Sequence, residues 1–169
     1  MMARWKSETG TTMIEVAVAS TILLVALLGL LSMGSLATVY TENHGHLEAR
    51  TAEYAQDKME QLLALAYTNQ TSNTVVFPAA TIGGTGMTPG GSVNTAAPVN
   101  GYVDWLGSDG SLLGGGTSAP TKWFYKRLWQ ISSPTTGLKQ ISVMVSVRSS
   151  VGGALLPKST VTAVKAWQF

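Results

Sequence analysis

The first feature of the hydropathy pattern is a long apolar run near the N-terminus. Residues 16–41 contain no charged side chain, and Ala, Leu and Val make up most of the run from Val16 to Leu36. Ala and Leu favour helix, and about 20 apolar residues cross a bilayer as a helix. The pattern therefore predicts a transmembrane helix over residues 11–40, preceded by a polar stretch at 1–10.

Helical periodicity continues beyond this run, through residues 41–67. Apolar or larger side chains recur there at steps of three and four, at Leu47, Thr51, Tyr54, Ala55, Met59, Leu62, Leu63 and Ala66. This spacing defines one helical face, and the acidic residues occupy mostly other directions. We expect one helix from Thr11 to about Tyr67, apolar on all sides in its first half and amphipathic in its second.

The remainder of the chain has the pattern of loops and strands. Residues 68–121 hold 11 of the 18 glycines, which predicts a long surface loop with one short strand near 99–105. The turn-forming sequences SSPTTG and SSVGGA then separate β-rich segments, which predicts an antiparallel meander. These segments are 122–131, 138–148 and 160–167. Alternation places Trp123, Tyr125, Arg127 and Trp129 on one face of the first segment, and Ile141, Val143, Val145 and Val147 on one face of the second.

The expected fold class is α+β. An apolar sheet face needs a cover, and the amphipathic helix at 41–67 is the one available. We therefore expect a long N-terminal helix packed on a small antiparallel sheet of about three to four strands. The predicted organisation is a leader at 1–10, a membrane helix at 11–40, and a head at 41–169 made of helix 41–67, loop 68–121 and strands 122–169.

Composition narrows the chemistry that the chain can support. Charged residues are 12% of the sequence, against about 25% in ordinary soluble domains. The absence of cysteine excludes disulfides, thiolate metal sites and cysteine nucleophiles. The segment Gly107-Ser-Asp-Gly110 is not the elbow of serine hydrolases, and the glycine clusters lack the spacing of phosphate-binding loops. We expect neither enzymatic activity nor a cofactor.

The junction before the apolar run carries the most specific signal. It reads Gly10-Thr-Thr-Met-Ile-Glu15, and Glu15 is the only acidic residue between Glu8 and Glu42. A carboxylate deep in a membrane costs about 2.5 kcal/mol or more. Cleavage after Gly10 would create a cationic amine on Thr11, which Glu15 of a neighbouring subunit could meet in a helix bundle.

This junction resembles the type IV pilin superfamily, which comprises pilins, minor pilins and type II secretion pseudopilins. Gly10, Thr12, Ile14 and Glu15 match its motif, and Thr11 stands where the family usually has Phe. The resemblance implies cleavage between Gly10 and Thr11 by a prepilin peptidase, N-methylation of Thr11, and assembly through Glu15. The emerging helix, TAEYAQDKMEQLLALAY, is similar to that of minor pilins and pseudopilins.

The resemblance also implies a function and partners. The chain would be a structural minor pilin of a type IV pilus-like filament, with a pilin-like fold. It would be stored in the bacterial inner membrane, in contact with lipid and with its N-terminus cytoplasmic, as Arg4 and Lys6 favour. Its partners would be other pilin subunits, the prepilin peptidase and the inner-membrane assembly platform. The alternatives are a periplasmic type II secretion pseudopilin, or a fibre-tip subunit that binds DNA or surfaces.

An ordinary cleaved signal peptide is a further alternative. Ser35-Leu36-Ala37 is a small-x-small site after an apolar segment. Against this interpretation, an acid directly before the apolar core is unusual, and the helical pattern continues past the site. We therefore expect the apolar helix to be retained.

Basic and aromatic residues alternate near the start of the final β-rich region, as in platforms for single-stranded nucleic acid. From Ser111 to the end there are seven Lys or Arg and no Asp or Glu. Aromatic side chains on a strand are more often core, however, and the net charge of +2 does not favour nucleic acid. The candidate contacts are Lys122, Trp123, Tyr125, Lys126, Arg127 and Trp129.

Two sets of residues suggest metal ligands only weakly. His44 and His46 are two apart and would point in different directions on a helix. Asp104 and Asp109 lie in a glycine-rich region, but calcium needs a fuller set of oxygen ligands. We expect no metal site.

Overall fold

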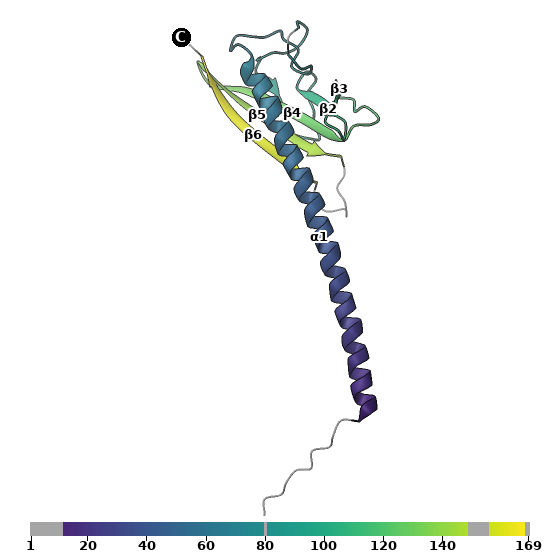
Figure 1. The fold of residues 1–169 in the computed structure, drawn as a ribbon. Coiled ribbons are helices and arrows are strands. Elements are labelled where there is room, and N and C mark those ends of the chain that lie inside the picture. Colours follow the sequence, from purple (N-terminus) through teal and green to yellow (C-terminus); the bar gives the residue numbers. More distant parts are fainter. Residues whose placement is uncertain (1–11, 80, 149–155, 168–169) are drawn as a thin grey trace, which may run out of the picture. The chain divides into compact units, whose positions relative to one another are not determined.

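A computed structural model of the chain describes residues 12–79, 81–148 and 156–167 (Figure 1). The chain divides into two compact units, Met1–Thr41 and Glu42–Phe169. One helix, α1, spans Met13–Ala64 and so contributes to both units. It is slightly shorter at each end than the predicted helix from Thr11 to Tyr67.

Local chemistry defines both ends of α1. The Thr12 carbonyl accepts hydrogen bonds from the backbone N–H groups of Glu15 and Val16, at 3.0 and 3.2 Å, so Thr12 is the N-cap residue. At the other end, the Lys165 ammonium donates to the carbonyls of Leu63 and Leu65. A cation at the last carbonyls compensates for their missing intrahelical partners and for the helix dipole. α1 ends at Ala64, between these two carbonyls in the sequence.

The second unit contains an antiparallel sheet of six strands. The strand order is β3-β2-β4-β5-β6, and β1 pairs with β4. This arrangement confirms the α+β class, whereas the prediction of three to four strands was too low. The strands are β1 Gly90–Gly91, β2 Val103–Leu106, β3 Leu112–Gly115, β4 Tyr125–Thr135, β5 Leu138–Val147 and β6 Lys158–Ala166.

The three long strands occupy the regions predicted for them, with shifted boundaries. β4 begins at Tyr125 and continues through Thr135, so most of the predicted turn SSPTTG is strand. The ladder with β5 is irregular between Ser132 and Thr135, where Pro134 cannot donate a hydrogen bond. The predicted turn SSVGGA, residues 149–154, lies outside the described residues.

The loop predicted at 68–121 contains the three short strands. The strand expected near 99–105 is β2, while β1 and β3 were not predicted because glycine makes up all of β1 and half of β3. At Gly91, φ is +82°, and a Cβ there would lie 2.2 Å from the Trp129 carbonyl oxygen. Only glycine allows β1 to approach β4 so closely.

The main core lies between the sheet and the part of α1 that crosses one of its faces (Figure 1). Alternate residues of β4 and β5 supply its sheet side, and a smaller cluster covers the opposite sheet face. The predicted face of β5, from Ile141 to Val147, is buried as expected. The larger cluster includes Ala55, Met59, Leu62, Trp129, Ile131, Ile141, Val143 and Val145.

The predicted buried face of α1 needs one correction. Leu62 is 1% exposed, but Leu63 is 37% exposed. Successive residues of a helix differ by about 100° in direction, so both cannot point into the same core. The stripe instead continues at Leu65, and it includes Lys58, which hydrophobicity alone did not identify. Ala66 is exposed as well.

This difference allows a matched test of the core. Leu62→Ala should lower the free energy of unfolding by about 2–5 kcal/mol, because it leaves a cavity in a closed site. Leu63→Ala removes the same atoms from a surface position and should change it by less than about 1 kcal/mol. Thermal melting of the full chain in detergent, followed by near-UV circular dichroism, measures both. Equal melting temperatures for the two variants would contradict this packing.

Candidate functional site: the apolar helix segment and the buried ion cluster

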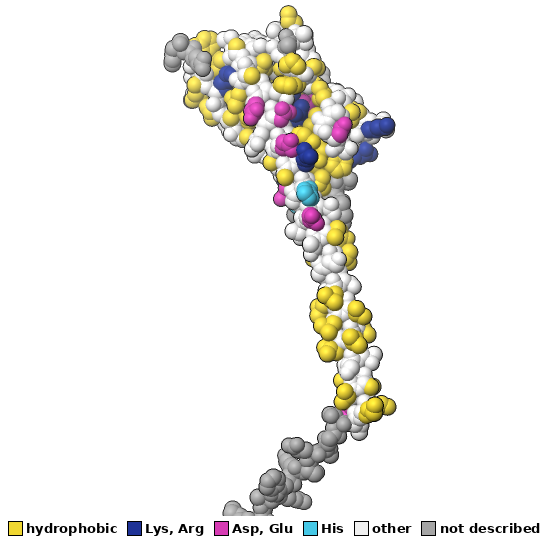
Figure 2. All heavy atoms as spheres, in the orientation of Figure 1, with side chains coloured by type: hydrophobic (Ala, Val, Ile, Leu, Met, Phe, Trp, Pro, Cys, Tyr) yellow, Lys and Arg dark blue, Asp and Glu magenta, His cyan; other side chains and the backbone are white. Residues whose placement is uncertain are grey.

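Every large hydrophobic side chain in the part of α1 that belongs to the first unit is exposed. From Met13 to Tyr40 the large hydrophobic side chains are between 46% and 93% exposed. No residue of the most apolar stretch of α1 is buried, and that stretch has a mean hydropathy of 2.5. Figure 2 shows hydrophobic side chains and few charges along this segment. By length and composition, α1 can cross a membrane.

Five hydroxyl groups within this segment are satisfied by the backbone of the helix itself. Each donates a hydrogen bond of 2.7–3.0 Å to the carbonyl four residues earlier in the helix. A hydroxyl without a partner is costly in an apolar environment, and this back-bonding removes that cost. The residues are Ser20, Thr21, Ser32, Thr38 and Thr41.

Glu15 lies in the first turn of α1 with its side chain exposed. With Thr12 as the N-cap residue, Glu15 occupies the third helical position, so Thr12-Met-Ile-Glu15 matches the capping-box pattern. A carboxylate there is favoured by the helix dipole. Glu15 is thus positioned to favour the start of the helix, in addition to its predicted role in assembly. The predicted cleavage and methylation residues, Gly10 and Thr11, lie outside the described residues.

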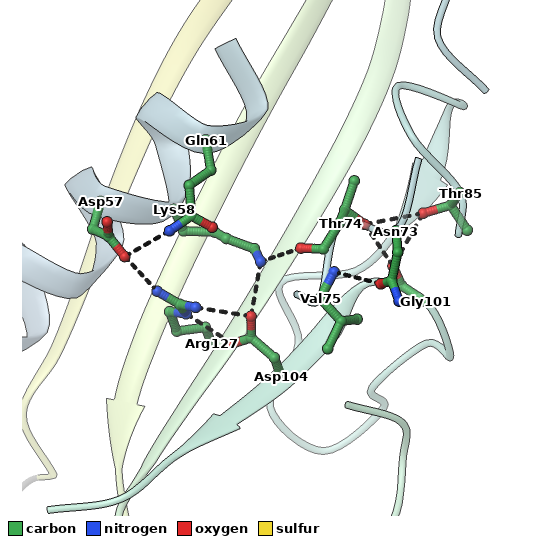
Figure 3. Close-up of polar contacts among 10 residues, drawn as sticks. All are labelled: Asp57, Lys58, Gln61, Asn73, Thr74, Val75, Thr85, Gly101, Asp104 and Arg127. Carbon is green, nitrogen blue, oxygen red and sulfur yellow. Dashed lines mark hydrogen bonds and ion pairs between the residues drawn. The ribbon is translucent and has the colours of Figure 1, made fainter. Parts of the chain in front are cut away.

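A second constellation, which we call the buried ion cluster, holds α1 to the sheet of the second unit (Figure 3). It consists of Asp57, Lys58, Asp104 and Arg127. The Lys58 ammonium donates to Asp104 Oδ2 at 2.8 Å. Arg127 binds both oxygens of Asp104, through Nε at 2.7 Å and Nη2 at 3.0 Å, and reaches Asp57 Oδ2 through Nη1 at 2.9 Å.

The cluster balances two cations against two carboxylates in a largely water-free site. The side chains of Lys58 and Asp104 are 0% exposed, while Asp57 is half exposed. Burial lowers the pKa of Lys58, although Asp104 opposes this shift. Burial also acts to lower the pKa of Arg127, but the attraction of Asp104 and Asp57 outweighs it and raises that pKa.

Further contacts extend the cluster to the loop before β1. The Lys58 ammonium also donates to the Thr74 carbonyl and lies 4.3 Å from the centroid of the Trp129 ring. Gln61 donates to Asp57 at 2.9 Å. The cluster therefore fixes α1, β2, β4 and the Thr74 loop in one arrangement. Lys58 lies three residues after Ala55 and four before Leu62. This helical spacing from two buried residues is the signal in the sequence that could have indicated its burial.

The six candidate nucleic-acid contacts do not form one exposed platform. Tyr125 and Trp129 belong to the main core, and Arg127 belongs to the buried ion cluster; all three are at most 3% exposed. Trp123 lies before β4 and packs against Trp105 at 4.8 Å between centroids, so its predicted placement on the Tyr125 face is wrong. Lys126 stacks on these same rings. Lys122 is exposed.

The weak metal candidates do not come together either. Asp104 lies in the buried ion cluster, and Asp109 accepts hydrogen bonds from the backbone and hydroxyl of Ser111, which lower its pKa. His44 Nδ1 lies 3.5 Å from a Glu48 oxygen. Within the described residues, no group of three or more His, Cys, Asp or Glu side chains could hold a metal ion.

Comparison of the chain with protein-family models, with curated proteins and with solved structures finds no match.

Proposed function

We propose that this protein is a structural minor pilin, a subunit of a type IV pilus-like filament that assembles through residues 11–40 of its N-terminal helix. The observation that carries the proposal is the exposed, uncharged stretch of α1, which has a single carboxylate in its first turn. An apolar surface of this size has to be covered by lipid or by other protein. In a pilin, this apolar surface is covered first by membrane lipid and then by neighbouring subunits in the filament core.

The physical chemistry of the segment suits transfer between these two environments. Lipid tails and neighbouring apolar helices solvate Leu and Val side chains equally well, so hydrophobic burial does not favour either state. The back-bonded hydroxyls avoid a polar penalty in both. Directed assembly then needs a polar interaction that exists only between subunits. The pairing of Glu15 with the amine of Thr11 on an adjacent subunit supplies it.

The proposal predicts a specific processing event. Prepilin peptidase should cut between Gly10 and Thr11, which removes Arg4, Lys6 and Glu8 and changes the formal charge from +2 to +1. N-terminal sequencing and intact mass of the membrane-extracted protein measure the cleavage and any methyl group on Thr11. Gly10→Val, which places a branched side chain at the cut, should leave the leader attached, whereas Ser7→Val should be processed normally.

Two results would contradict this proposal. A mature chain that begins at Thr38 would identify an ordinary secreted protein, because cleavage after Ala37 removes the apolar segment. Equal processing of Gly10→Val and the native chain would exclude a prepilin-type cut. Expression beside a pilus machinery and beside a type II secretion machinery then separates the minor pilin from the pseudopilin, by the filament that incorporates the chain.

A further inference from the structure

The second unit has a hollow of about 850 Å³. It lies between the beginning of the unit's helical part, the last residues of β5, the first residue of β6 and the residues around the start of β4. Three cationic side chains line it, with one tryptophan, one histidine and one acid. We call it the basic groove and define it by His44, Glu48, Trp123, Lys126, Arg148 and Lys158. Without a charge on His44, its cations exceed its acids by two.

Neutral groups hold two of these cations in place. The Lys126 ammonium donates to the Thr95 carbonyl at 2.8 Å and lies 5.1 Å from the centroid of Trp105. Arg148 donates to the Thr121 carbonyl at 3.2 Å, and its guanidinium lies 5.5 Å from the centroid of Trp123. Carbonyls and aromatic faces orient a cation without cancelling its charge. The groove is therefore preorganised for an anion.

The position of His44 in the sequence relates this groove to the apolar run. Thr41 ends the uncharged stretch, and His44 follows three residues later, which is about 4.5 Å along a helix. The headgroup region of a bilayer adds roughly 5–8 Å to each side of its hydrocarbon core. With Thr41 at the edge of that core, which residues 22–41 are long enough to span at ~1.5 Å per residue, His44 lies among the headgroups. Trp123 and the half-exposed Leu156 suit such an interface.

We propose that the basic groove binds the headgroup phosphate of an anionic phospholipid in the leaflet from which the helix emerges. This inference rests on the proposed membrane anchoring and adds a lipid preference to it. A zwitterionic headgroup carries its own cation, which would face Lys126, Arg148 and Lys158, so an anionic lipid is preferred. Glu42 and Glu48 oppose the attraction, and the excess of cations overcomes them. Docking to lipid would hold the head against the membrane before assembly.

The test uses the full chain in lipid nanodiscs. Because the sequence has no cysteine, Ala96→Cys, at an exposed position lining the groove, accepts a single fluorescent donor. Energy transfer to an acceptor on the lipid headgroups then reports docking. Transfer should be greater in discs that contain phosphatidylglycerol than in discs of phosphatidylcholine alone, and added salt should abolish the difference.

Substitutions of the three groove cations test whether lipid docking depends on this groove. Lys126→Gln, Arg148→Gln and Lys158→Gln should each weaken docking to the anionic discs by about fivefold. Arg50→Gln is the matched control, since it removes an exposed cation that pairs with Glu53 elsewhere on the helix, and it should have no effect. The salt titration of the native groove tests the proposal even if a variant folds poorly.

Several outcomes would overturn the inference. Equal transfer in both kinds of disc, or an equal loss with Arg50→Gln, would exclude a specific lipid site. A change in the donor's own emission when millimolar inorganic phosphate is added at constant ionic strength, in discs of phosphatidylcholine alone, would assign the groove to a free anion. Resistance of the chain to alkaline extraction is measured in parallel: a chain that inserts without lipid preference contradicts this inference alone, whereas a chain that does not insert also contradicts the proposed function.

Discussion

Replacing Asp104 with alanine is expected to lower the free energy of unfolding of the second unit by about 3–5 kcal/mol. Asp104 is the only carboxylate that contacts both buried cations, Lys58 and Arg127, within the described residues. Its removal leaves the Lys58 ammonium beside the Trp129 ring with only the Thr74 carbonyl as an acceptor. A buried charge that loses its partner retains the full cost of its desolvation.

Two control variants make this prediction specific. Glu53→Ala breaks the exposed pair with Arg50 and should change the free energy of unfolding by less than about 1 kcal/mol. Lys58→Met removes a buried cation but leaves Asp104 bound twice by Arg127, so it should be milder than Asp104→Ala. Guanidinium unfolding of the full chain in detergent, followed by tryptophan fluorescence, gives all three values. Similar small values for Asp104→Ala and Glu53→Ala would show that the cluster does not stabilise the fold.

The parts of the fold that could be predicted are those with a sustained hydrophobic period. α1 was found from its uncharged run and its three- and four-residue spacing, and β5 from the alternation between Ile141 and Val147. A hydrophobic period shows which face of a helix or strand is buried, and it can be read from a single sequence. The exposure of Leu63 shows its limit, since two adjacent leucines give the same hydrophobic signal whichever of them faces the core.

Two of the short strands, β1 and β3, could not be predicted because they carry almost no side-chain pattern. β1 is two glycines, and half of β3 is glycine. Their positions depend on backbone hydrogen bonds to strands that come later in the sequence, such as the pairing of Gly91 with Gln130. A glycine-rich sequence permits this pairing but does not specify it.

Of the candidate sites, one could be predicted from the sequence and the other could not. Glu15 was identified from a local motif, because its position next to an apolar run is visible within a few residues. The buried ion cluster joins residues that are 46 and 23 positions apart, so it could not be inferred before the strand register was known. The strand at Tyr125–Trp129 gave an ambiguous signal, because an aromatic and basic alternation suits both a binding platform and a core with an internal ion pair.

Replacing Glu15 with alanine should prevent incorporation of the protein into filaments while leaving membrane insertion and cleavage intact. Within a filament core the carboxylate needs a cation, and the amine of Thr11 on the adjacent subunit is the partner that we propose. Loss of one member of a buried pair costs about 3–5 kcal/mol, which corresponds to more than about 100-fold in an assembly equilibrium. Insertion survives because alanine is uncharged and favours helix, and cleavage survives because Gly10 is unchanged.

A second substitution separates this charge pairing from the capping of α1. Glu15→Gln keeps a side chain that can complete the capping box with Thr12, but it cannot pair with an amine as an anion. If pairing drives assembly, Glu15→Gln should be as defective as Glu15→Ala. If Glu15 only starts the helix, Glu15→Gln should assemble normally. Each variant is expressed beside the pilus machinery, and its amount is compared in sheared-fibre and membrane fractions. Native levels of Glu15→Gln in fibres would reject the pairing mechanism, because the glutamine retains the shape of the native residue and lacks only its charge.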